Sequence, residues 1–228
     1  MTKGIFVTGT DTGVGKTLVA VAMLRTLVAD GVRAVGMKPV AAGVAPDANV
    51  HADVAALGAA GNVDAPLPDV NPYSFAPAVA PHLAAARAGV AIDLAVIAAA
   101  YRRLSARADV VVVEGAGGAF VPLGPRADML DIAAALGLPV LLVVGVRLGC
   151  LNHALLSAVA IAARGLPLAG WVANRIDPAM EAGSANVAAL AERLPAPLVA
   201  DFAWRDEDAP ELRLDHAALR ALAIGRAA

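Results

Sequence analysis

A glycine-rich segment, Gly9–Thr17, restricts the fold of this chain more than any other feature of its sequence. It follows the apolar run Gly4–Thr8, which is typical of a buried strand, and it leads into Lys16–Ala29, which is typical of a helix. Glycines let the backbone curl so that successive N–H groups point at phosphate oxygens, and the following helix adds its positive N-terminal end. The segment therefore predicts a phosphate-binding P-loop between the first strand and the first helix.

The spacing within this segment differs from the usual P-loop pattern by one residue. Five residues separate Gly9 from Gly15, where the common pattern has four, and Thr10 stands where a glycine is usual. An ordinary glycine-rich turn is the alternative interpretation. We expect Lys16 to reach the β- and γ-phosphates of a nucleotide and Thr17 to ligate Mg²⁺. The nucleotide-binding residues expected here are Thr12, Gly13, Val14, Gly15, Lys16, Thr17 and Leu18.

Short runs of β-branched and aliphatic residues alternate with longer alanine-rich runs along the chain. This order is typical of βαβ units, and near-continuous apolar runs suit strands that are buried on both faces. We therefore predict an α/β fold with a P-loop NTPase-type parallel sheet and helices on both faces. Strands are expected at Gly4–Thr8, Arg33–Lys38, Asp109–Glu114, Pro139–Gly145, Leu168–Asn174 and Leu198–Ala200, and helices at Lys16–Ala29, Ala52–Ala60, Ile92–Ala106, Met129–Leu136, Asn152–Arg164, Ser184–Leu194 and Asp215–Ala223.

The proline-rich stretch Asn62–Pro81 interrupts this alternation. Its prolines exclude a regular helix or a central strand, so we expect a long loop, either ordered or mobile. A loop of this length usually has a functional reason.

Composition limits the class of protein further. The 228 residues fit one large domain, so we expect residues 1–228 to form a single domain. Although 59% of the residues are hydrophobic, no uninterrupted apolar run approaches the roughly 20 residues that span a bilayer. With no leader-like start, we expect a cytoplasmic protein without a membrane partner. A net charge of −2 gives no reason to expect nucleic acid, and the single cysteine, Cys150, excludes an internal disulfide.

Three charged residues stand where local rules leave them unexplained. Glu114 ends an apolar run, and open α/β sheets bind ligands at the carboxyl ends of their strands. Lys38 closes another strand immediately before Pro39, where a cation would face a transferred phosphoryl group or an anionic substrate; a snorkelling surface lysine is the alternative. Asp53 is either an acidic ligand or a helix cap. Because Mg²⁺ prefers hard oxygen ligands, we expect one or two carboxylates near Thr17 to complete its site, and Glu114 and Asp53 are the candidates.

Several motifs together resemble those of dethiobiotin synthetases. The resemblance covers nearly the whole chain in the same order, and its Lys-Pro-Val and Glu-Gly-Ala-Gly-Gly pieces are far more specific than the P-loop, which many unrelated ATPases share. The motifs are Gly9–Thr17, Lys38–Val40, Val113–Gly118, Gly149–His153 and Gly170–Asn174, with Asn71–Tyr73 and Pro81–His82 in the central loop.

The resemblance implies an ATP- and Mg²⁺-dependent enzyme that forms a ureido ring on 7,8-diaminononanoate with CO₂. One amine takes up CO₂ as a carbamate, whose oxygen attacks the γ-phosphate of ATP to give a carbamic–phosphoric mixed anhydride. The second amine then closes the ring and expels phosphate. Such a reaction needs positioning and neutralisation of charge rather than covalent protein chemistry.

The resemblance also assigns roles to individual residues. Lys16 and Lys38 are implied as catalytic cations, and Thr17, Asp53 and Glu114 as the ligands of Mg²⁺. Asn174 is implied as the adenine-recognising residue, and Ala203–Arg205 as the segment that covers the base. It further implies a homodimer, in which Leu148–Asn152 reaches the substrate of the other subunit. The remaining implied nucleotide contacts are Asp53, Glu114, Gly115, Ala116, Gly117, Arg175, Ala203, Trp204 and Arg205, and the implied substrate contacts are Lys38, Ala42, Leu148, Gly149, Cys150 and Asn152.

Three positions differ from the family pattern. Ala42 replaces a serine of some relatives, Asn186 stands where some have a tyrosine, and Ala203 replaces a proline beside the base. These differences bear on substrate affinity and nucleotide preference more than on reaction type.

A ParA- or MinD-like switch ATPase is the competing interpretation, because such proteins share the expected fold. They usually carry a signature lysine near the start of the P-loop, where this chain has Asp11. They also often end in a basic amphipathic membrane helix, whereas Leu212–Ala228 is short and mixed in charge.

Overall fold

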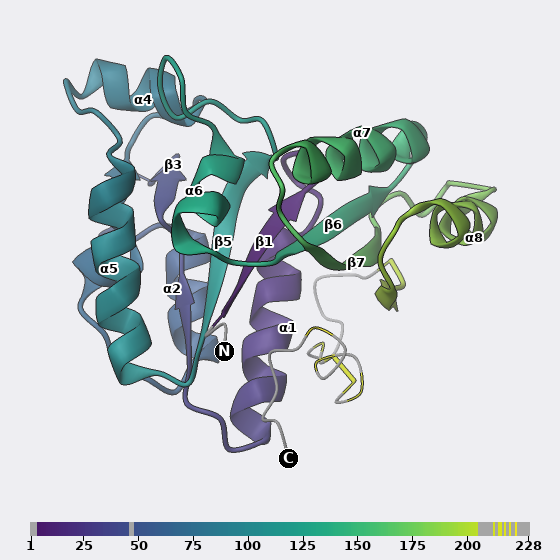
Figure 1. Ribbon diagram of the computed structural model, residues 1–228, viewed down its shortest axis with the longest axis horizontal. Helices are drawn as coiled ribbons and strands as arrows, with labels where there is room; N and C mark the ends of the chain where they lie inside the picture. The colour runs from purple at the N-terminus through teal and green to yellow at the C-terminus, as the bar shows by residue number, and fades with distance from the viewer. Residues whose placement is uncertain are drawn as a thin grey trace.

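The computed structural model describes residues 4–45 and 48–204, and beyond them only positions 212, 214, 215, 217, 219 and 222. Within these residues, six strands form one sheet in the order β2-β5-β1-β6-β7-β8, and each neighbouring pair is parallel. Helices cover both faces of the sheet (Figure 1). The predicted α/β fold with a parallel sheet is therefore confirmed.

The elements follow one another as the sequence pattern predicts, and most of their ends lie within two residues of the expected positions. The exception is β5, which continues through Gly118, so Glu114 lies inside this strand rather than at its end. The strands of the main sheet are β1 (Gly4–Gly9), β2 (Ala34–Met37), β5 (Val110–Gly118), β6 (Val140–Val146), β7 (Leu168–Arg175) and β8 (Leu198–Phe202). The helices over it are α1 (Lys16–Ala29), α2 (Ala52–Ala60), α5 (Leu94–Arg107), α6 (Met129–Leu136), α7 (Cys150–Ala163) and α8 (Gly183–Arg193).

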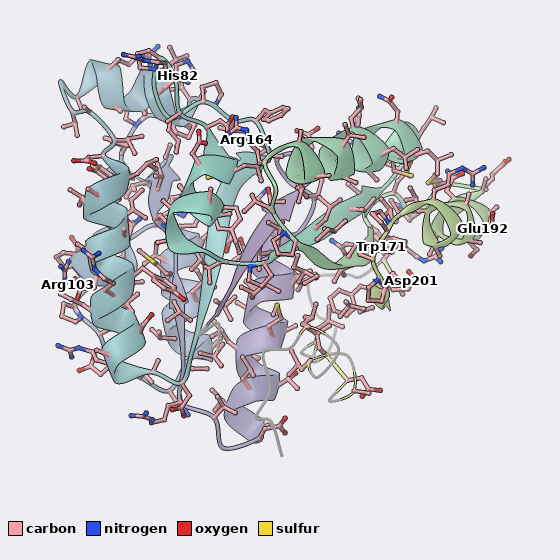
Figure 2. All side chains as sticks on the ribbon, viewed as in Figure 1. His82, Arg103, Arg164, Trp171, Glu192 and Asp201 are labelled. Carbon is pink, nitrogen blue, oxygen red and sulfur yellow. The ribbon has the colours of Figure 1, made fainter. Side chains whose placement is uncertain are left out.

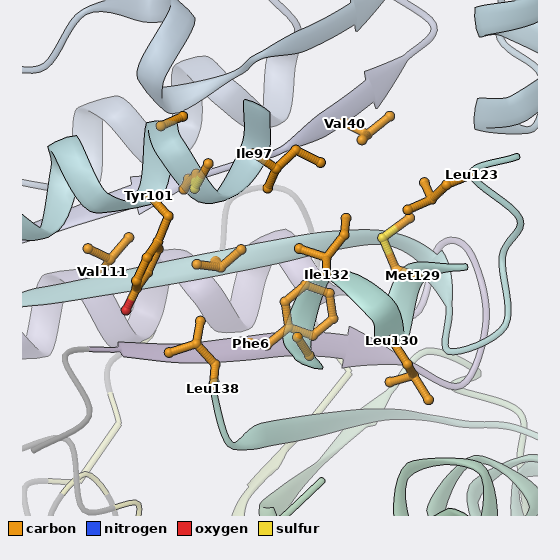
Figure 3. Close-up of a cluster of buried hydrophobic side chains, with 14 of the residues drawn as sticks. Phe6, Val40, Ile97, Tyr101, Val111, Leu123, Met129, Leu130, Ile132 and Leu138 are labelled. Atoms are coloured by element: carbon orange, nitrogen blue, oxygen red, sulfur yellow. The ribbon is translucent and has the colours of Figure 1, made fainter. Parts of the chain in front are cut away.

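Alternate residues of the central strands pack against opposite helix layers, because successive side chains of a strand point to opposite faces. Ile5 and Val7 of β1 pack with α1 and α2, whereas Phe6 packs on the other face with α5 and α6 (Figure 3). Trp171 of β7 lies under α7 and α8. Both faces are therefore buried, which explains why these strands are apolar along nearly their whole length.

A glycine lets α2 approach the edge of the sheet closely. A Cβ atom on Gly36 of β2 would lie 2.7 Å from the Cβ atom of Leu57 in α2, which is closer than real side chains approach. This close packing brings the first turn of α2, with Asp53, toward the carboxyl end of β2.

The proline-rich stretch is built from short elements that the sequence pattern did not predict. It contains α3 (Leu67–Val70) and β4 (Tyr73–Phe75), and β4 pairs in parallel with β3 (Val40–Ala42) to form a second, two-stranded sheet. The helix α4 (Pro81–Arg87) follows. The expectation of a long loop without a helix is therefore wrong, whereas the stretch, as expected, contributes no strand to the main sheet.

Charged side chains project from the outer surfaces of the helices, as Arg103 of α5 and Glu192 of α8 illustrate (Figure 2). Among the described residues, no helix combines the length and the apolar character needed to cross a membrane. The expected helix Asp215–Ala223 lies largely outside the described residues. Of this end of the chain, Leu214, Leu219 and Leu222 pack into the cluster that contains α1.

Candidate active site

The register of the sheet places Lys38 and Glu114 beside the P-loop. Met37 of β2 pairs with Val113 of β5, and Glu114 pairs with Val7 of β1. Lys38 therefore follows its strand at the level of Glu114, and the P-loop begins two residues after Val7. One edge of the sheet therefore brings together the carboxyl ends of β1 and β2 and the part of β5 around Glu114. Open α/β sheets bind ligands at the carboxyl edge of their strands.

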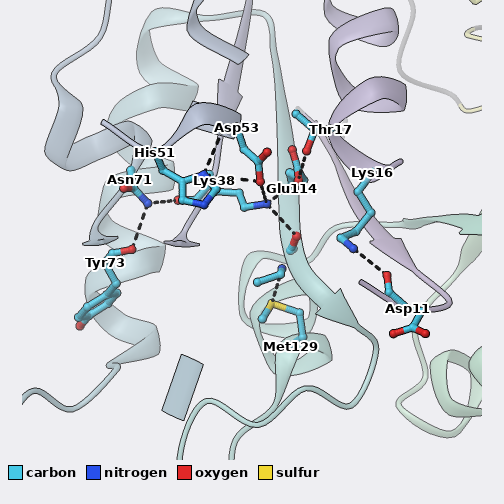
Figure 4. Close-up of polar contacts among 12 residues, drawn as sticks. Asp11, Lys16, Thr17, Lys38, His51, Asp53, Asn71, Tyr73, Glu114 and Met129 are labelled. Carbon is cyan, nitrogen blue, oxygen red and sulfur yellow. Dashed lines mark hydrogen bonds and ion pairs between the residues drawn. The ribbon is translucent and has the colours of Figure 1, made fainter. Parts of the chain in front are cut away.

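Lys38 lies between two carboxylates at this point (Figure 4). Its Nζ donates to Asp53 Oδ2 at 2.8 Å and also to Glu114 Oε1. Thr17 Oγ1 donates to the same oxygen of Glu114 at 2.8 Å. Lys38 and Glu114 are 4% and 0% exposed, so their charges are held away from water and depend on each other for compensation.

The charges of this cluster determine its protonation. Burial alone would lower the pKa of Lys38, but the charges of Glu114 and Asp53 and their hydrogen bonds outweigh this and raise it. Burial alone would raise the pKa of Asp53, but the charge and hydrogen bond of Lys38 lower it. Lys38 is therefore a cation and Asp53 an anion at neutral pH.

Lys16 has a different environment from Lys38. Its Nζ donates to the carbonyl oxygen of Asp11 at 2.9 Å. The pKa of Lys16 is lowered to about 8, mainly by burial and then by the positive charge of Lys38. The charges of Glu114, Asp53 and Asp11 raise this pKa, but by less. An anion beside this ammonium would replace water lost through burial, so the position favours binding of a phosphate.

The P-loop backbone has the conformation that its glycines allow. Gly13 and Gly15 have φ values of 74° and 90°, in the left-handed region that favours glycine. Helix α1 starts directly after Gly15 with no side-chain cap and no acid in its first turn. Its first N–H groups therefore point toward the site without a side-chain partner, as an anion-binding helix end requires.

The side chains around Glu114 fit a divalent cation. Glu114 Oε2 is buried and has no hydrogen-bond partner among the described residues, although a buried carboxylate oxygen normally has one. The hydroxyl of Thr17 and the carboxylate of Asp53 lie in the same cluster. These are hard oxygen ligands, and Mg²⁺ typically takes one or two carboxylates and keeps several waters.

These residues line a pocket of about 740 Å³. Most of the residues that the sequence predicts for the P-loop and the sheet edge lie together in it. Its walls include Thr12, Gly13, Gly15, Lys16, Thr17, Lys38, Ala42, Asp53, Glu114, Ala116 and Gly117, and the sequence did not predict the contributions of Ala41, His51, Ala78–Pro81 and Val121.

Asp53 is not the cap of α2. The cap is His51, whose Nδ1 accepts a hydrogen bond from the N–H of Asp53 at 3.1 Å. The carboxylate of Asp53 is consequently available to Lys38 and the pocket. Of the two roles considered for Asp53, the geometry favours the ligand role.

Comparison with known proteins decides the family. A family model described as an AAA domain matches residues 3–211. The chain is 53% identical over 213 residues to the ATP-dependent dethiobiotin synthetase BioD of Nitrosospira multiformis, and the matched residues cover 93% of each chain. It is 57% identical over 196 residues to the protein of the same name from Aromatoleum aromaticum, which covers 85% of this chain and 87% of the relative. The chain belongs to the ATP-dependent dethiobiotin synthetase family.

Two solved structures with a similar fold share much less sequence with this chain than these two dethiobiotin synthetases do. A ParA family ATPase from Chlorobium tepidum has a TM-score of 0.52 at 14% identity and covers 98% of this chain and 90% of its own. Chloroplast FtsY from Physcomitrella patens also has a TM-score of 0.52, at 18% identity, and covers 97% of this chain and 65% of its own. Such identities establish a shared fold alone.

Some residues that the resemblance to dethiobiotin synthetases assigned to the nucleotide lie outside the pocket wall. Asn174 is 5% exposed, and its Nδ2 donates to the carbonyl oxygen of Val14 at 2.9 Å, behind the P-loop. Arg175 is paired with Asp201 in two hydrogen bonds. Trp204 is exposed. Val14, Leu18, Gly115 and Ala203 likewise do not line the pocket, and Arg205 lies outside the described residues.

The residues assigned to the substrate in the segment Leu148–Asn152 also lie outside the pocket of their own chain. They stand at the start of α7, where Leu148 is 89% exposed and Cys150 is buried. Within the described residues, the pocket therefore contains only Lys38 and Ala42 of the predicted substrate contacts.

Two contacts around the site were missed from the sequence. Arg147 donates to Asp11 Oδ2 at 2.7 Å, which ties the P-loop to the segment before α7. Asn71 donates to the carbonyl oxygen of Lys38 at 2.6 Å. Neither contact has a local sequence signal, because each joins segments that are far apart along the chain.

Proposed function

We propose that this protein forms dethiobiotin, ADP and phosphate from 7,8-diaminononanoate, CO₂ and ATP. Its relatives of 53% and 57% identity carry the name ATP-dependent dethiobiotin synthetase. The observation that carries the proposal at the level of chemistry is the position of Lys38, buried beside Glu114 and Asp53 on the wall of the P-loop pocket. A second cation beside Lys16 suits transfer of a phosphoryl group to an anionic acceptor.

The first steps make a phosphorylated carbamate. One amine of the substrate attacks the carbon of CO₂ and loses a proton, which gives a carbamate. A carbamate oxygen then attacks the γ-phosphorus of ATP, and ADP leaves. Lys16 and Lys38 bind the phosphoryl and carbamate oxygens on which negative charge collects, and the N–H groups at the start of α1 orient the phosphates.

The last step closes the ring. The second amine attacks the carbonyl carbon of the mixed anhydride, phosphate leaves with its pair of electrons, and the nitrogen loses a proton. Lys38 stays beside the leaving phosphate through both transfers. No covalent bond to the protein is needed, because the pocket contributes position and positive charge.

We infer that Thr17, Asp53 and Glu114 hold Mg²⁺ when nucleotide binds. The pocket wall contains two cations, Lys16 and Lys38, and two anions, Asp53 and Glu114. Its charges already balance, so the triphosphate and the carbamate bring negative charge that the side chains alone do not neutralise. Bound Mg²⁺ supplies this charge and polarises the phosphate oxygens.

We infer that two copies of the chain share the substrate site. Leu148, Leu156 and Val159 are 89%, 60% and 66% exposed, and the two residues of α7 lie three positions apart on one face of the helix. An exposed apolar face of this kind marks an interaction site. Pairing of two copies through this face would bring Leu148–Asn152 to the partner's pocket. Asn174 and Ala203–Arg205 stay predicted contacts of the base, and Arg175 stays a predicted contact of the nucleotide.

The function is tested by mixing purified protein with the diamine, bicarbonate, Mg²⁺ and ATP. We expect dethiobiotin and ADP in a one-to-one ratio, measured by mass spectrometry and a coupled ADP assay. ATP hydrolysis at the same rate with and without the diamine would support a switch ATPase instead.

Lys38→Ala is expected to lower turnover by about 100-fold or more and to change ATP affinity by less than about threefold, because Lys38 acts on charge that develops during phosphoryl transfer. Turnover is measured under saturating substrates and ATP affinity by titration calorimetry with Mg²⁺ present. Lys16→Ala is the matched comparison, and it should weaken ATP binding itself. Wild-type turnover in Lys38→Ala would remove Lys38 from the mechanism.

The shared site predicts that Leu156→Asp with Val159→Asp produces monomers that bind ATP but lose diamine turnover by about tenfold or more, because charge at an apolar interface opposes its burial. Light scattering gives the mass and the dethiobiotin assay gives the turnover. Val96→Asp, at a 46% exposed position of α5, is the control and should leave both unchanged. Full turnover by a monomer would contradict the shared site.

A further inference from the structure

A buried side-chain amide holds the main chain of Lys38. Asn71 follows α3 and is 7% exposed. Its Nδ2 donates to the carbonyl oxygens of Lys38, at 2.6 Å, and Tyr73, at 3.1 Å (Figure 4). The N–H of Lys38 donates to the carbonyl oxygen of Val70 at 2.9 Å. Both main-chain polar groups of Lys38 are therefore bonded to the short segment formed by residues 70 and 71.

This segment supports Lys38 where the main sheet cannot. Among the described residues, β2 is an edge strand that pairs with β5 alone, and the pairing reaches Met37. Lys38 comes directly after this last pair and directly before Pro39, which has no N–H to donate. The outer side of the strand end is thus held by Val70 and Asn71 rather than by another strand of the sheet.

The supporting segment is itself anchored on two sides. Arg103 Nε of α5 donates to Asp69 Oδ1 at 2.7 Å, and Asp69 is 5% exposed. On the other side, the N–H of Tyr73 donates to the carbonyl oxygen of Pro39 at 3.1 Å. A chain of contacts therefore runs from α5 through Asp69 and Asn71 to the main chain of Lys38.

We propose that Asn71 is a positioning residue that sets the location of the Lys38 ammonium for phosphoryl transfer. The proposal rests on the proposed function of Lys38. Loss of the Asn71 amide leaves the buried carbonyl oxygen of Lys38 without the donor that this side chain supplies, which favours a shift of the strand end toward water or other partners. Because a misplacement of about 1 Å can cost about 100-fold in rate, a small shift of Lys38 is enough to lower turnover.

The test compares Asn71→Ala with Asn71→Leu, which removes the donor but keeps a side chain of similar size. We expect both variants to lose about tenfold or more in kcat, with the KM for ATP within about twofold, since the P-loop is not displaced. Wild-type kcat in both folded variants would overturn the proposal.

Asn62→Ala is the matched control for loss of a strand-supporting amide. Asn62 supports the other end of β2. Its Oδ1 accepts a hydrogen bond from the N–H of Ala34 at 2.9 Å, and its Nδ2 donates to the carbonyl oxygen of Val32 at 3.0 Å. We expect Asn62→Ala to lower the midpoint of thermal unfolding as Asn71→Ala does, but to leave kcat unchanged. An equal loss of kcat in both variants would mean that destabilisation, not position, lowers the rate.

A double-mutant cycle tests whether Asn71 acts through Lys38. In a Lys38→Ala background, Asn71→Ala should lower the residual rate by less than about twofold, because the group that it positions is gone. The same fold-loss in both backgrounds would overturn the proposal.

Hydrogen exchange separates failure of this proposal from failure of the proposed function. Exchange of the Lys38 N–H, followed in a peptide that covers residues 36–41, should become faster in Asn71→Ala whatever reaction the enzyme catalyses. If wild-type protein forms no dethiobiotin while this exchange becomes faster, the proposed function fails and the positioning contact stands. Unchanged exchange in Asn71→Ala overturns the positioning role directly.

Discussion

The buried contact of Lys38 with Glu114 and Asp53 is the interaction on which the rest of the site depends. A buried ion pair adds little net stability compared with apolar packing, but loss of one partner leaves the other charged and unpaired at a cost of several kcal/mol. Glu114 is fully buried inside β5, so it needs Lys38 and Thr17 for compensation. Thr17 ends the P-loop and the other two groups lie beside it, where phosphate and a divalent cation offer other partners. The cluster is therefore a place where binding can exchange one set of charge contacts for another.

The parallel sheet brings these groups together, and structures outside the sheet hold them in position. Register alone sets Lys38 beside Glu114, because Met37 of β2 pairs with Val113 of β5 and the next residue of each strand lies at the same level. Gly36 allows α2 to approach and supply Asp53. The outer side of Lys38 is held by Asn71, from a segment that the main sheet does not include. Both lysines among the described residues line the pocket, while arginines make up 15 of the chain's 18 basic residues. A compact ammonium suits a crowded phosphoryl site better than a planar guanidinium does.

Local pattern was sufficient to predict the main sheet and part of the site. The order of strand, glycine turn and helix around Gly15 is set by residues next to one another, and so are the apolar runs of the buried strands. Lys38 and Glu114 were predicted as site residues because a charged residue next to a buried apolar run does not stabilise the strand unless it is paired. The elements α3, β3 and β4 were missed because prolines hide their periodicity and their partners lie elsewhere in the chain. Asn71 was missed as a support of Lys38 for the same reason. The capping role of His51 was also missed, since histidine is an uncommon cap. The single-domain organisation stays a prediction.

The most direct measurement of the central claim is the affinity of Mn²⁺, used in place of Mg²⁺, for the complex with a non-hydrolysable ATP analogue. Free and bound Mn²⁺ are distinguished by electron paramagnetic resonance. If Thr17, Asp53 and Glu114 form the cation site beside Lys38, Glu114→Gln should weaken Mn²⁺ binding by about tenfold or more while the protein stays folded. Equal Mn²⁺ affinity in wild-type protein and folded Glu114→Gln would contradict the account.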